Sequence, residues 1–201
     1  MFTLVGPHTP GEYFSQSGTW GGVKYDTYRR PTYDKKADSV DADGNPVYWK
    51  IYQKGCALSC VAMALKAFGC DVDPGKLNAW MTDHHGFNGS SIDWKSTVLG
   101  WSSSISVSDQ VGKGLYYEGD VLKRPLDSEI PGTEKLDQNL LLGYPAFVQF
   151  VNPDTGHEHW ALVTGKTQRG QYTVLDPGND RRVVLDNSST KFYKYRLVTP
   201  Q

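Results

Sequence analysis

Three residues of this sequence, a cysteine, a histidine and an aspartate, could together perform nucleophilic chemistry. Cys56 follows Gly55 at the start of an apolar run with helical spacing, 56–68. Unpaired N–H groups and the positive end of the helix dipole gather at a helix N-terminus, so a thiolate is stabilised there and the pKa of the thiol falls. The pattern therefore predicts a reactive thiol at the tip of a helix, although a lone cysteine in an apolar helix is more often inert core.

Two segments further along the chain could supply the partners that such a thiol needs. His159 opens an apolar run, and Asp176 ends a strand-like run and precedes a Pro-Gly pair. A cysteine nucleophile requires an imidazole to take its proton, and that imidazole requires an acceptor on its other nitrogen. Each element is weak alone, because a histidine at a strand end is commonly solvated and Asp-Pro-Gly is commonly a turn. Together with Cys56 they can meet if the two runs form adjacent strands.

The composition argues against several classes of partner and site. Lys and Arg number 21 against 22 Asp and Glu, and this balance predicts no nucleic-acid partner. The cysteines Cys56, Cys60 and Cys70 are an odd number without a second pair of ligand-spaced residues, so we expect neither a disulfide framework nor zinc. The oxygens that begin at Asp41 resemble the start of a calcium loop, but its twelfth position is Tyr52 instead of Glu, which favours a plain turn. We expect no metal and no cofactor.

The length of 201 residues is natural for one domain, 1–201. Its longest apolar stretches fall well short of the roughly 20 residues that a membrane-spanning helix needs. The Met1 end lacks a basic segment followed by an apolar one, so we expect no signal peptide. The sequence does not indicate a compartment or an oligomeric state.

The periodicity of the sequence changes along the chain from helical to strand-like. Residues 1–50 show little periodicity, and 13–20 has the look of a short strand or extended arm. Helices are expected at 56–68 with Gly69 as the stop, at 74–81 with Asp73 as the N-cap, at 92–99 capped by Ser90 or Ser91, and at 133–143. Strands are expected at 114–117, 144–151, 159–164, 171–175, 182–185 and 192–198. Helices first and antiparallel strands second predict an α+β fold.

The ordered set of motifs resembles the papain-like cysteine peptidases, and within them the peptidase C39-like family of the bacteriocin-processing, double-glycine type. The resemblance spans about residues 12–180 and is specific in its order rather than in any one piece. It rests on the following residues: Tyr13 to Gln16 with Trp20, Gly55 to Met63, Phe68-Gly69, Asp73-Pro74, Leu77-Asn78, His159-Trp160, Val163 to Gly165, and Asp176-Pro177-Gly178.

This resemblance implies a papain-like fold, in which a helical lobe carries the nucleophile against an antiparallel sheet that carries the base. It implies Cys56 as nucleophile, His159 as general base and then acid, and Asp176 as the residue that orients the imidazole. The implied reaction is attack of the thiolate on an amide carbonyl of a peptide or protein, followed by an acyl-enzyme and its hydrolysis.

The resemblance also implies an oxyanion donor from a glutamine upstream of the nucleophile, together with the backbone N–H of Cys56. The family keeps that glutamine about six residues before the cysteine, where this chain has Lys50. Gln16 has the right local context but lies forty residues upstream, which would make 17–52 an insertion or extended loop region. Gln53 is three residues away and remains the alternative, and we favour Gln16.

A second histidine, His157, is the rival to His159 as base, because residues two apart on a strand face the same side. His159 is favoured because the family motif places the base directly before Trp160. Trp94 and Trp101 are expected to be core residues rather than a substrate platform.

Three functions fit these observations. The first is a cysteine peptidase acting on a peptide or isopeptide amide. The second is a hydrolase of the peptide crosslinks of bacterial cell walls, phage-borne or released by lysis. The third is a non-catalytic domain that retains the fold to bind a partner, which would place the sulfur of Cys56 beyond hydrogen-bond reach of both His157 and His159. Gly55 stands where the processing branch has an acid, so a double-glycine leader substrate is not implied.

Overall fold

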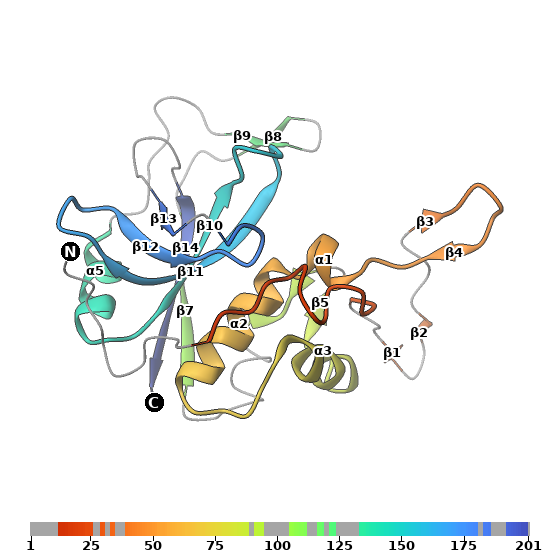
Figure 1. Cartoon of the computed structure of the whole chain (residues 1–201), viewed down its shortest axis with the longest axis horizontal. Coiled ribbons are helices and arrows are strands. Elements are labelled where there is room, and N and C mark those ends of the chain that lie inside the picture. Colours follow the sequence, from red (N-terminus) through yellow and green to blue (C-terminus); the bar gives the residue numbers. More distant parts are fainter. Residues whose placement is uncertain are drawn as a thin grey trace.

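A computed structural model of the chain describes residues 12–25, 29–30, 33–34, 39–88, 91–94, 105–111, 116–118, 121–123, 133–180, 183–185 and 192–200. In this part of the chain, helices pack on an antiparallel sheet, which gives the expected α+β class (Figure 1). The helices are α1 (Ile51–Lys54), α2 (Cys56–Ala67), α3 (Pro74–Asp83) and α5 (Glu134–Leu141).

The main sheet has six strands in the order β13-β12-β11-β10-β14-β7, and every neighbouring pair is antiparallel. Their bounds are β7 (Ile105–Val111), β10 (Ala146–Val151), β11 (Glu158–Lys166), β12 (Tyr172–Leu175), β13 (Val184–Leu185) and β14 (Phe192–Pro200). Four short hairpins are formed by β1 (Arg29–Arg30) with β2 (Tyr33–Asp34), β3 (Ser39–Val40) with β4 (Pro46–Val47), β5 (Phe87–Asn88) with β6 (Ser91–Ile92), and β8 (Tyr116–Glu118) with β9 (Val121–Lys123).

Helix α2 is the centre of the core and lies between the sheet and α3 (Figure 1). Every residue from Ala57 to Leu65 is buried, so this helix is buried on all sides, and all but Ser59 of these residues belong to the hydrophobic core. It is joined directly to α1 by Gly55, where a β-carbon would stand 2.5 Å from the carbonyl oxygen of Ile51. Only glycine fits there. Gly69 follows the helix with φ +84°, the predicted left-handed stop.

The start of α3 also follows its sequence signals. Asp73 is the N-cap and its carboxylate accepts a hydrogen bond of 2.8 Å from the backbone N–H of Lys76, while Pro74 occupies the first helical position. The helix ends at Asp83, two residues beyond the expected Met81.

Both faces of the sheet are buried, and alternate residues of its central strands belong to two different hydrophobic clusters. Phe147 and Leu162 pack with α2, whereas Val148 and Ala161 pack with Leu140 of α5. Phe147 lies opposite Leu162, and Val148 lies opposite Ala161, in the β10–β11 register. This register fixes which residues of β11 can face the helical layer.

Three expectations about local structure require correction or lie partly outside the described residues. Ile92 belongs to strand β6, opposite Phe87, instead of starting a helix, because both apolar side chains are buried by pairing in a tight hairpin. Residues 95–99, 114–115 and Trp101 lie outside the described part. The segment 13–20 is an extended stretch followed by turns from Gln16 onwards, and it forms no strand. None of the described helices is both long and apolar enough to cross a membrane.

Candidate active site

The topology brings Cys56, His159 and Asp176 together. Cys56 is the first residue of α2, His159 is the second residue of β11, and Asp176 follows the last residue of β12 directly. Because β11 and β12 are antiparallel neighbours, the start of β11 lies beside the end of β12. Helix α2 packs against β11, and its first residue, Cys56, lines the same cleft as Glu158 and Trp160, the two neighbours of His159 in sequence.

The His159 side chain interacts with both Asp176 and Cys56. His159 Nε2 lies 2.5 Å from Asp176 Oδ1, and both side chains are buried. The His159 imidazole also interacts with the Cys56 thiol, and this interaction shifts the pKa values of both groups. Since Asp176 occupies Nε2, Nδ1 is the nitrogen that can exchange a proton with the sulfur.

The electrostatics of this site favour a charged pair. Burial alone would raise the pKa of the Cys56 thiol, but the hydrogen bond and charge of His159, with backbone N–H groups, bring it below its ordinary value. Burial alone would lower the pKa of His159, yet the contacts with Asp176 and Cys56 raise it to about 9. Both of these opposite shifts favour a thiolate facing an imidazolium.

The other two thiols have the opposite character. All three cysteines are free. Cys60 is buried one turn after Cys56, its thiol contacts the carbonyl oxygen of Trp160 at 3.5 Å, and burial raises its pKa well above the ordinary value. Burial also raises the pKa of Cys70. The expectation of at least one free thiol is confirmed, and Cys56 is the one of the three whose environment favours the thiolate.

An N-terminal segment, residues 13–16, lies against the turn that carries Asp176. The Tyr13 hydroxyl donates to the backbone carbonyl of Asp176 at 2.8 Å, and the backbone N–H of Gln16 donates to the carbonyl of Pro177 at 2.9 Å. The side-chain amide of Gln16 donates to the carbonyl of Tyr52 at 2.7 Å. Gln16 thus connects the turn after Asp176 with Tyr52 of α1, which lies four positions before Cys56.

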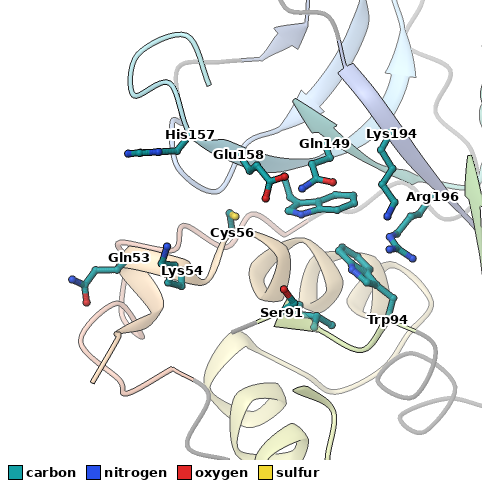
Figure 2. A pocket seen from close by; sticks show the side chains of 12 residues that line it. Gln53, Lys54, Cys56, Ser91, Trp94, Gln149, His157, Glu158, Lys194 and Arg196 are labelled. Atoms are coloured by element: carbon teal, nitrogen blue, oxygen red, sulfur yellow. The ribbon is translucent and has the colours of Figure 1, made fainter. Parts of the chain in front are cut away.

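The alternative glutamine, Gln53, has a local structural contact instead. Its side-chain oxygen accepts a hydrogen bond of 2.9 Å from the backbone N–H of Lys50, which forms part of the capping box of α1. Gln53 lines the same cleft as Cys56, but Figure 2 shows its side chain pointing away from that residue. The rival base, His157, is exposed and points away from Cys56 as well (Figure 2).

Cys56 opens onto a cleft of about 430 Å³ between the helical layer and the sheet. Residues of α1, α2 and β6 line one side, and residues of β10, β11 and β14 line the other. Trp94 is buried as expected of a core residue, and it also lines this cleft. The sequence did not single out the polar side chains of the sheet side, which are Gln149, Glu158, Lys194 and Arg196.

The described residues contain no group of three or more His, Cys, Asp or Glu side chains that could hold a metal ion. The turn at Asp41 is held by its own carboxylate, because one oxygen accepts from the backbone N–H groups of Asp43 and Asn45 at 3.0 and 2.8 Å. This is the pattern of an Asx turn.

Comparison with protein families agrees with the fold and the order of these residues. A profile of the Peptidase_C39 like family matches residues 42–197. The chain belongs to this family. Membership implies the papain-like fold and the cysteine peptidase class, with peptides or proteins as substrates. A comparison with curated proteins finds no match.

The family match includes Cys56, His159 and Asp176 and begins after Gln16. The assignment of Gln16, and the treatment of 17–52 as an insertion within a single domain, therefore stay predictions.

Proposed function

We propose that this protein is a cysteine peptidase that hydrolyses a peptide or isopeptide amide with Cys56 as nucleophile. The observation that carries the proposal is the hydrogen bond between the His159 imidazole and the Asp176 carboxylate, together with the effect of this imidazole in lowering the pKa of the Cys56 thiol. It argues against a domain that only binds a partner, because such a domain needs no oriented imidazole beside the sulfur. The lowered pKa of Cys56 supports the same conclusion.

Each residue has a defined part in this reaction. The Cys56 thiolate attacks the amide carbonyl, and the protonated His159 donates its proton to the departing amine as the C–N bond breaks. In the second stage His159 accepts a proton from a water molecule, which attacks the thioester and releases the acid. Asp176 holds the imidazole in one tautomer and orientation throughout both stages.

The developing oxyanion requires hydrogen-bond donors beside Cys56. The backbone N–H groups of the first turn of α2 have no partners within the helix, so the N–H of Cys56 is available for this role. Gln16 is the proposed second donor. Its amide nitrogen carries two hydrogens, of which one is taken by the carbonyl of Tyr52.

The direct test compares two single substitutions in α2. Cys56→Ala should abolish cleavage of a randomised peptide pool, while Cys60→Ala removes a thiol one turn further on and should leave cleavage within about threefold of the wild type. Mass spectrometry of the products reads both. Cleavage that persists in Cys56→Ala at the wild-type rate would refute the proposal.

A cell-wall crosslink is the second candidate substrate, and the cationic lining of the cleft favours it because wall peptides carry free carboxylates. Zymography on purified peptidoglycan separates the two substrates. Clearing that depends on Cys56 is expected for a wall hydrolase, whereas a peptidase of ordinary proteins cuts the peptide pool and leaves the wall intact.

A further inference from the structure

The part of the cleft that β14 contributes carries two cations on one side of one strand. Lys194 and Arg196 are two residues apart and both line the cleft (Figure 2). In the β10–β14 register Lys194 lies opposite Gln149, which lies opposite Trp160 of β11. These three neighbours form a polar and aromatic row across the sheet, and all of them line the cleft.

Two indole rings support the guanidinium of Arg196. Its central carbon lies 4.8 Å from the ring centroid of Trp94 and 5.6 Å from that of Trp160. Both rings are buried, and their centroids are 4.6 Å apart. The N–H groups of a guanidinium lie in its own plane, and this planar fork matches both oxygens of a carboxylate. Contact of the cation with aromatic rings is compatible with this mode of binding.

The charge of the lining also favours an anion. Among the described residues that line the cleft, three are cationic (Lys54, Lys194 and Arg196) and one is a carboxylate (Glu158), whereas the whole chain has a formal net charge of −1. A cleft with low-dielectric walls and one dominant sign of charge concentrates ligands of the opposite sign. This cleft therefore attracts anionic peptides in spite of the overall charge.

The spacing of the strands gives the distance between an anion bound at Lys194 and the strand beside Cys56. Lys194 lies two strands away from β11, which is roughly 10 Å, or about three residues of an extended peptide. Lys194 is the residue to substitute, because a change at Arg196 would remove its contacts with Trp94 and Trp160 together with its charge.

We propose that Lys194 and Arg196, with Trp94 and Trp160 beneath the guanidinium, form a subsite for a substrate carboxylate two to four residues from the scissile amide. This inference rests on the proposed function for the position of the scissile bond. The carboxylate is either an Asp or Glu side chain or the free C-terminus of a short peptide. Gln149 beside Lys194 can donate a further hydrogen bond from its amide.

The experiment measures binding in a protein that cannot cleave. Immobilised Cys56→Ala protein is mixed with a randomised octapeptide pool, prepared once as C-terminal acids and once as C-terminal amides, and the retained peptides are sequenced by mass spectrometry. We expect roughly tenfold enrichment either of Asp and Glu at one position or of acids over amides. The two arms distinguish the side chain from the terminus.

Variants of Lys194 test which residues cause the enrichment. In the Cys56→Ala protein, the further substitution Lys194→Gln should lower the enrichment of carboxylates about tenfold. Lys194→Glu should replace this enrichment with a preference for Lys and Arg. Lys135→Gln on α5, which removes one exposed positive charge outside the cleft lining, should change nothing. A pool retained without preference for carboxylates, or a preference that Lys194→Gln leaves intact, would overturn the subsite.

The same peptides incubated with the wild type test the catalytic proposal separately. Acidic enrichment on Cys56→Ala without cleavage by the wild type would keep the subsite and reject the peptidase. Cleavage without carboxylate preference would keep the peptidase and reject the subsite. If the protein is a peptidase and has the subsite, Lys194→Gln should mainly raise KM, because the carboxylate is bound equally in the ground and transition states.

Discussion

Gly178 lies directly against the imidazole of His159. A β-carbon at residue 178 would stand 3.2 Å from Nε2 and 2.7 Å from Cε1 of that ring, and the second distance is shorter than real β-carbon contacts. The backbone N–H of Gly178 also donates to Asp176 Oδ1 at 2.9 Å. The Asp-Pro-Gly segment, which on its own is commonly only a turn, thus supplies both the acceptor for the imidazole and the surface against which the ring packs.

This contact makes Gly178→Ala informative. The added methyl group must displace the His159 ring, and a displacement of about 1 Å at a catalytic group can lower the rate by about 10²-fold. We expect the loss in kcat, with little change in Tm because residue 178 is exposed. Gly22→Ala is the matched control, since a β-carbon there would meet nothing within 4 Å. Equal kcat values for the two variants would show that the ring is not held in this way.

The two glutamines can be separated by a pair of alanine variants. Gln16→Ala should lower kcat by about 10²- to 10³-fold, the usual cost of removing one oxyanion donor. Gln53→Ala removes the hydrogen bond to Lys50 that caps α1 and should cost about 0.5–1 kcal/mol of unfolding free energy with activity retained. Steady-state kinetics and denaturant unfolding of both variants measure this. The opposite pattern would assign the donor to Gln53.

Tyr13 is expected to act as a positioning residue through Asp176. Its hydroxyl donates to the Asp176 carbonyl at 2.8 Å, and burial raises its pKa, so it stays a protonated donor at neutral pH. Tyr13→Phe should cost about 1 kcal/mol of unfolding free energy. We also expect kcat to fall several-fold, while Tyr52→Phe, an exposed tyrosine on α1, serves as the control. An unchanged kcat in Tyr13→Phe would show that the Tyr13 hydroxyl stabilises the fold without positioning Asp176 for catalysis.

The caps and stops of the helices were predictable because they depend on neighbours in sequence. Asp73 with Pro74 starts α3, and Gly69 ends the α2 region, as local rules require. Ile92 was wrongly assigned to a helix, since the burial of Ile92 opposite Phe87 depends on tertiary packing. Strand β7 was missed, although Ile105 and Val107 alternate with serines in a strand-like period.

The site residues likewise divide into those that the sequence could predict and those that depend on tertiary packing. The types and order of Cys56, His159 and Asp176 predicted a Cys-His-Asp site, and the β11–β12 pairing that brings the last two together was the condition stated for it. Lys194 and Arg196 could not be foreseen, because they line the cleft only after β14 pairs with β10 across more than forty residues of sequence.

The pH profile of kcat/KM follows from the shift of His159. Its pKa is raised to about 9, so the imidazolium that donates to the leaving amine is present below that value and is lost as the pH rises through it. Activity should therefore fall on the alkaline side near pH 9. On the acid side it should fall as Cys56, whose pKa is lowered, takes up a proton. A rate that keeps rising above pH 9.5 would contradict the proposed role of His159.

The most direct test of the central claim is the rate at which iodoacetamide alkylates each cysteine as a function of pH, followed by mass spectrometry. Near pH 7, Cys56 should react at least tenfold faster than Cys60 or Cys70, because only its thiolate is stabilised. His159→Gln should slow Cys56 by at least tenfold, since burial then acts without the imidazole. Equal rates at the three cysteines, or a Cys56 rate that His159→Gln leaves unchanged, would contradict an activated Cys56–His159 pair.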